Sequence, residues 1–94
     1  MPFDQPFPRS FNVSSVRAYA PTLSGVYGIS NAREWVYIGE TDNIQEALLG
    51  HLRDLDSDVM KRQPTGFVVE VCDRANRLTR QDRLILEYKP TCGR

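Results

Sequence analysis

The spacing of apolar residues along the chain predicts three strands and several helices. Two runs, 24–29 and 35–39, are rich in β-branched and aromatic residues and flank the polar stretch 30–34. Such residues pack well on a pleated surface, so these runs predict a β-hairpin with its turn in the polar stretch. A third run, 67–72, is apolar almost throughout, which predicts a strand buried on both faces.

Helical spacing follows the hairpin. Four apolar side chains recur there every three or four residues: Ile44, Leu48, Leu52 and Leu55. Thr41 or Asp42 is the expected N-terminal cap, because either side chain offers an oxygen to a free backbone N–H. A second, short helix is expected at 57–62, and Pro64 then breaks the chain.

The last helix has two candidate starts. Thr79 with Asp82 three residues later forms a capping box, and a start near Ala75 also fits the pattern. Pro90 ends the helix in either case, because proline has no backbone N–H to continue it.

The N-terminal segment differs from the rest of the chain. Residues 1–10 carry three prolines, so they are expected to be extended and mobile unless an aromatic side chain docks on the body: Phe3, Phe7 or Phe11. A short helix is predicted within 12–20, with Asn12 or Ser14 as its cap and Pro21 at its end.

Together these elements predict an α+β fold with the order β-β-α-(α)-β-α. The three strands form an antiparallel sheet flanked by helices, because so small a sheet needs helices to cover its apolar surface. The length of 94 residues fits one domain. Residues 24–94 are assigned to this domain and residues 1–23 to the extended segment with its short helix.

The charge balance narrows the functions to be considered. Twelve basic residues oppose twelve acidic ones, which argues against strong non-specific binding to nucleic acid but leaves room for a local basic patch. Cys72 and Cys92 are expected to be free thiols, with a disulfide between them left open. One histidine and two isolated cysteines are poor material for a zinc site.

No apolar run is long enough to cross a membrane, and no membrane partner is expected. The first residues lack the basic start and apolar middle of a signal peptide. A cytoplasmic location is therefore expected.

The predicted hairpin carries two short motifs. Gly25-Val26-Tyr27 lies on its first strand and, after nine intervening residues, Tyr37-Ile38-Gly39 lies on its second. The pair resembles the signature of the GIY-YIG nuclease family, with valine in place of the first isoleucine. The segment 40–44 and the closing stretch 84–90 are also similar to the family, so the resemblance runs from about residue 24 to the C-terminus.

The resemblance implies a metal-dependent endonuclease site that hydrolyses DNA. In the family, one tyrosine helps to activate the attacking water and the other supports the phosphate. An arginine on the first helix stabilises the developing charge, and a glutamate on the last helix binds a divalent metal ion. Such groups suit phosphodiester hydrolysis, which needs an activated oxygen and positive charge at the phosphate.

Only part of this site is present in the sequence. Tyr27 and Tyr37 match, and His51 stands where many members carry a histidine. The arginine position holds Ala47 and the glutamate position holds Gln81. The family's asparagine position falls at Gly93, outside the residues that the structure describes.

Two functions follow from this comparison, beside a structural or interaction module in which the family's cleft is simply filled. The first is a binding module for nucleic acid or protein that lacks the family's hydrolysis and needs no cofactor. The alternative is a divergent endonuclease that uses Tyr27, Tyr37 and His51, with Mg²⁺ as its cofactor. In that alternative His51 is a general base, whereas otherwise it is a half-buried residue hydrogen-bonded on its helix.

Four residues are candidates for contacts with nucleic acid: Gly39, Arg53, Arg77 and Arg80. The last two belong to a row of arginines at i, i+3 spacing that suits phosphate contacts or an ordinary solvated face. Glu40, Glu70 or Asp82 are candidates to replace the missing acid, and Arg33, Arg53 or Arg80 to replace the missing cation, although the pattern favours a solvated surface charge for each of them.

Overall fold

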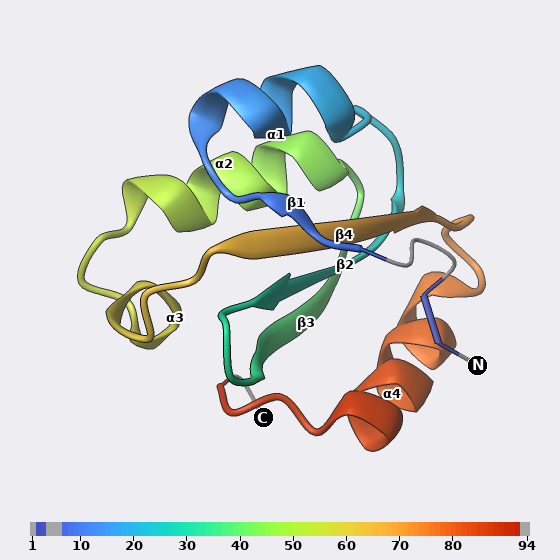
Figure 1. The fold of residues 1–94 in the computed structure, drawn as a ribbon. Coiled ribbons are helices and arrows are strands. Elements are labelled where there is room, and N and C mark those ends of the chain that lie inside the picture. The colour runs from blue at the N-terminus through green and yellow to red at the C-terminus, as the bar shows by residue number, and fades with distance from the viewer. Residues whose placement is uncertain (1, 4–6, 93–94) are drawn as a thin grey trace.

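A four-stranded antiparallel sheet lies at the centre of the computed structural model, which describes residues 2–3 and 7–92 (Figure 1). The elements in chain order are β1 (Arg9–Ser10), α1 (Val13–Tyr19), β2 (Gly25–Ser30), β3 (Trp35–Thr41), α2 (Ile44–Arg53), α3 (Asp58–Lys61), β4 (Gly66–Val71) and α4 (Arg77–Tyr88). The strands lie in the order β1-β4-β2-β3, so β3 is an edge strand.

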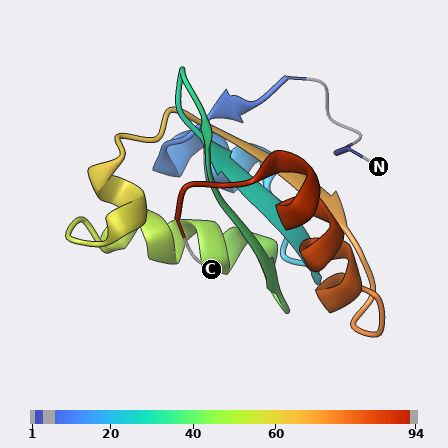
Figure 2. The ribbon, with the colours of Figure 1, turned by 90° about the horizontal axis from the view of Figure 1, so that it is seen from below.

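The sheet is covered by helices on both faces. The alternation of side chains along β2 sends Val26 to the face that α4 covers and Tyr27 to the face that α1 and α2 cover. Leu84 of α4 is fully buried against the face that carries Val26, and Leu48 of α2 is fully buried against the face that carries Tyr27. Seen from the edge of the sheet, β3 lies between α2 and α4 (Figure 2).

The predicted fold class is confirmed, with one strand more than expected. β1 pairs with β4 through Arg9 opposite Phe67 and Ser10 opposite Gly66. This strand has only two exposed residues and therefore no apolar alternation from which to predict it. Phe3 and Phe11 dock on the body, whereas Phe7 is 78% exposed.

The cap of α2 was predicted wrongly. β3 continues to Thr41, so the helix begins later and Asn43 is its cap, with its side chain accepting a hydrogen bond from the backbone N–H of Glu46. Thr41 instead accepts from the N–H of Asn43. The helix ends at Arg53, which leaves Leu55 outside it and exposed.

The start of α4 also corrects an expectation. The helix begins at Arg77, after Asn76, so Thr79 lies within the helix and is not its cap. A carboxylate oxygen of Asp73 accepts hydrogen bonds from the backbone N–H and the side-chain amide of Asn76. These bonds fix the turn that precedes the helix, and they favour the earlier of the two predicted starts.

The cap of α1 is one of the two that the sequence offered. Asn12 caps α1 and accepts a hydrogen bond from the N–H of Ser15 at 2.8 Å, and α3 lies within the predicted range 57–62, with Ser57 as its cap. Burial of β4 on both faces holds only for its first half, because Val71 at its end is exposed. Cys72 and Cys92 are free thiols. Among the described residues, no helix has the length and apolar character that a membrane span requires.

Candidate active site

The two motifs of the hairpin place two tyrosines side by side on the face that α2 covers. In the pairing of β2 with β3, Tyr27 lies opposite Gly39 and Tyr37 lies opposite Ile29. The ring centroids of the two tyrosines are 6.0 Å apart. A Cβ atom on Gly39 would lie 2.7 Å from the Tyr27 hydroxyl oxygen, so this close approach of ring to backbone requires glycine.

His51 completes a cluster of three rings. Ile44 and Leu48 anchor α2 in the core, and His51 lies one turn beyond Leu48 on the same side of the helix. Its Nε2 atom is 2.9 Å from the Tyr27 hydroxyl oxygen, and its ring centroid is 5.0 Å from that of Tyr37. The structure therefore brings Tyr27, Tyr37 and His51 together, and we name them the ring cluster.

Burial shifts the pKa values of Tyr27 and His51 in opposite directions. Desolvation raises the pKa of the Tyr27 hydroxyl well above its ordinary value, and the neighbouring Tyr37 and Glu40 raise it further. Desolvation lowers the pKa of His51, although Asp54 acts in the opposite direction. A neutral imidazole whose proton lies on Nδ1 can accept a hydrogen bond at Nε2, so the Tyr27 hydroxyl is placed to donate to it.

This arrangement predicts that acid destabilises the protein through His51. The pKa of His51 is below its ordinary value of 6.5 in the folded state, so below that pH the unfolded chain takes up a proton that the folded chain does not. The free energy of unfolding should therefore fall as the pH drops from 7.5 to 5. Urea denaturation across this range should show a weaker fall for His51→Gln; an equal fall would contradict the prediction.

Ala47 and Gln81 bring no charge to the site. Ala47 lies on α2 one turn before His51 and packs against the core beneath the helix. Gln81 lies on α4 and is only 9% exposed. Alanine has no guanidinium and glutamine has no carboxylate, so neither position carries a charge.

The candidate arginines of α4 are held by acidic residues of the sheet. Arg77 donates to Glu40 at 2.6 Å and to the Ser24 hydroxyl at 3.0 Å, and it also contacts Asp42. This contact with Arg77 lowers the pKa of the Asp42 carboxyl below its ordinary value. Arg77 therefore ties the start of α4 to the end of β3.

Arg80 is held in the same way. It donates to both carboxylate oxygens of Glu70, at 2.6 and 2.9 Å, and to the backbone oxygen of Pro2 at 3.0 Å. Glu40 and Glu70, the candidate replacements for the missing acid, are thus both engaged by arginines. A phosphate at either arginine would have to compete with a carboxylate that is already in place.

Arg53 differs from these two arginines. Its guanidinium lies 3.9 Å from Glu46, and both side chains are well exposed. Such surface pairs contribute little, so Arg53 can turn to another anion at low cost. It follows His51 by two residues at the end of α2.

No local pattern in the sequence indicates the partners of Arg77. Its partners lie 35 to 53 residues away along the chain: Ser24, Glu40 and Asp42. Pairs on one helix can be predicted from a spacing of three or four residues, whereas pairs so far apart in sequence cannot. Their meeting follows from the packing of α4 beside β3.

Solved structures share this arrangement of sheet and helices. A point mutant of the GIY-YIG N-terminal endonuclease domain of UvrC from Thermotoga maritima superposes with a TM-score of 0.70, covering 84% of this chain and 96% of that one, at 22% identity. The magnesium-bound form of the same domain gives a TM-score of 0.67, covering 80% and 91%, at 22% identity. The chain has the GIY-YIG fold. No protein-family model and no curated protein matches the sequence.

The GIY-YIG domain of UvrC binds a catalytic divalent cation, magnesium, in one of these solved structures. Within residues 2–3 and 7–92, no group of three or more His, Cys, Asp or Glu side chains is placed to hold a metal ion. Gln81 offers a neutral amide oxygen, whereas Mg²⁺ prefers carboxylates. The residues present therefore do not fit a tightly bound divalent cation.

Proposed function

We propose that this GIY-YIG-fold domain binds nucleic acid on the face that carries the ring cluster and does not hydrolyse it efficiently. The observation that carries the proposal is the pair Ala47 and Gln81, which brings an apolar and a neutral side chain to positions where hydrolysis calls for charge. The fold, which solved endonuclease domains share, supports nucleic acid as the partner.

Magnitudes favour binding over hydrolysis. Removing one group that stabilises the transition-state charge costs a factor of about 10²–10³ in rate. Here the cationic group and the metal-binding carboxylate are both replaced, while Arg77, Arg80, Glu40 and Glu70 are engaged with one another in pairs. Binding of a phosphate backbone needs neither group, since an exposed cation such as Arg53 contributes to it directly.

The binding half of the proposal is tested with fluorescence anisotropy. A labelled oligonucleotide should bind at low salt and dissociate as salt rises. Arg53→Gln should weaken binding and reduce the slope of log K against log salt by about one, the release expected for one phosphate contact. Arg17→Gln, which removes the same charge from the exposed surface of α1, should change neither quantity.

Absence of binding at low salt would overturn the nucleic-acid assignment. Equal effects of the two arginine substitutions would contradict the placement of the binding face on α2.

The catalytic half is tested by restoring the missing charges. The double variant Ala47→Arg/Gln81→Glu should acquire Mg²⁺-dependent nicking of supercoiled plasmid, each change contributing a factor of about 10²–10³. The wild-type protein should remain at the background of the buffer. The control Ala18→Arg/Thr79→Glu adds the same two charges at exposed positions of α1 and α4, and it should gain nothing.

A divergent endonuclease is the second candidate function. It is favoured by the 2.9 Å contact between the Tyr27 hydroxyl and Nε2 of His51, since a neutral imidazole can act as a general base. Metal-dependent nicking by the wild-type protein that disappears in Tyr27→Phe, Tyr37→Phe and His51→Gln would establish this function and overturn the non-hydrolytic proposal.

A further inference from the structure

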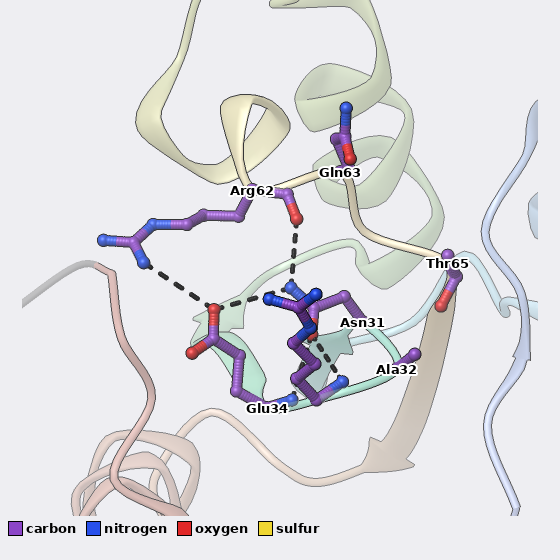
Figure 3. A pocket seen from close by; sticks show the side chains of 7 residues that line it. Asn31, Ala32, Glu34, Arg62, Gln63 and Thr65 are labelled. Carbon is purple, nitrogen blue, oxygen red and sulfur yellow. Dashed lines mark hydrogen bonds and ion pairs between the residues drawn. The ribbon is translucent and has the colours of Figure 1, made fainter.

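The turn of the β2–β3 hairpin separates two cavities. The larger, of about 410 Å³, lies between this turn and the segment that joins α3 to β4, and Figure 3 shows the side chains that line it. The smaller, of about 270 Å³, lies on the side of Pro8 and Trp35. Arg33 lines both cavities. The larger cavity is of the size that binds small ligands, which is usually about 300–1,000 Å³.

The wall of the larger cavity is held in place by Asn31. Its side-chain oxygen accepts hydrogen bonds from the backbone N–H groups of Arg33 and Glu34, at 2.8 and 2.9 Å. Its amide nitrogen donates to the backbone oxygen of Arg62 at 3.0 Å, across the cavity (Figure 3). The turn and the opposite segment are thus joined, so the cavity does not depend on a flexible loop to close it.

The charges in this cavity are unequal. Arg62 and Glu34 point toward each other, with their nearest nitrogen and oxygen atoms 3.6 Å apart (Figure 3). The Arg33 side chain makes no hydrogen bond or ion pair with any residue in the described part of the chain. Two guanidinium groups and one carboxylate leave the cavity with a net positive charge of one.

We propose that this cavity binds a phosphate group, with the Arg33 guanidinium as its principal contact. A guanidinium presents several N–H donors in a plane that matches the oxygens of a phosphate. Thr65 and Gln63 also line the cavity, and their side chains carry a hydroxyl and an amide that can donate hydrogen bonds. The site is separate from the ring cluster and does not rest on the proposed function.

Two sources could supply such a phosphate: a free nucleotide or the backbone of a nucleic acid. NMR titration of the ¹⁵N-labelled protein distinguishes them, with inorganic phosphate, AMP and a six-nucleotide single strand added in turn at constant ionic strength. All three should shift the backbone amide signals of residues 31–34, Gln63 and Thr65. Tighter binding of AMP would identify a nucleotide as the source, and tighter binding of the oligonucleotide would identify the backbone.

The variant Arg33→Gln should weaken phosphate binding by about tenfold or more, the effect of losing a charge-assisted hydrogen bond. It should remain folded by circular dichroism, because the turn is held through the backbone of Arg33 and not through its side chain. The control Arg17→Gln should bind as the wild type does.

Three results would overturn the proposal. These are an absence of shifts in residues 31–34 with every phosphate compound, equal affinity of the Arg33→Gln variant and the wild type, and equally tight binding of malonate, which would show a site for anions in general. None of them bears on oligonucleotide binding at Arg53, so the two proposals fail independently.

Discussion

Replacing Gly25 with alanine is expected to cost the protein much of its folding free energy. An added Cβ atom would lie 2.2 Å from the backbone oxygen of Glu70 and 2.7 Å from a methyl group of Ile44. The oxygen belongs to β4, which pairs with β2, so it cannot move away without disturbing the sheet. Overpacking usually costs about 1–3 kcal/mol, and a clash with backbone belongs at or above the upper end of that range.

Urea denaturation measures this effect, and Gly50→Ala is its matched control. Gly50 lies within α2 with nothing within 4 Å of the position of an added Cβ atom. Alanine there should stabilise the protein by about 0.5–1 kcal/mol, because it restricts the unfolded chain and favours the helix. A Gly25→Ala variant as stable as the wild type would show that the first motif glycine is not required by the packing of the strands.

The second large effect is expected at Phe67. Its side chain is the largest of those that are fully buried, with 0% exposure, and its ring centroid lies 6.1 Å from that of Phe11. Truncation of a buried phenylalanine costs about 3–5 kcal/mol through lost transfer free energy and the cavity left behind. Since small domains are stable by only about 5–15 kcal/mol, Phe67→Ala should leave a protein that is marginally folded.

Thermal denaturation followed by circular dichroism tests this prediction. Leu86→Ala is the control, because Leu86 is 76% exposed on α4 and its removal should change stability by no more than about 0.5 kcal/mol. Similar losses of stability in the two variants would mean that the packing of Phe67 against Phe11 is not important for stability. Loss of the Phe67 ring should also remove the ring contact of Phe11 and leave the hydrogen bond from its N–H to the backbone oxygen of Thr65 to hold it.

The two glycines of the hairpin motifs have different physical roles. Gly25 admits the backbone of β4, whereas Gly39 admits the ring of Tyr27. The motif therefore combines a constraint on the sheet with a constraint on the site. A match in these triplets therefore indicates the fold and the geometry of the rings. It does not indicate whether positions 47 and 81 carry the charges that hydrolysis needs.

The resemblance in the hairpin motifs indicated part of the candidate site, and the predicted elements explain why its members meet. Tyr27 and Tyr37 lie on paired strands of one hairpin, and His51 lies on the helix that follows, so few arrangements keep them apart. The states of the arginines could not be predicted in this way. Arg53 is exposed, whereas Arg77 is held by Glu40 and Asp42, and neither state is marked by the residues next to it along the chain.

The sequence by itself determined the hairpin and the amphipathic helices and narrowed the cap of α1 to Asn12 or Ser14, because these depend on residues within a few positions of one another. Tertiary structure decided the rest. The strand at Arg9–Ser10 exists because β4 offers it a free edge, and the cap of α2 moved to Asn43 because β3 extends to Thr41. Ion pairs and cavities likewise join residues from distant parts of the chain, so they form only once the helices are packed on the sheet.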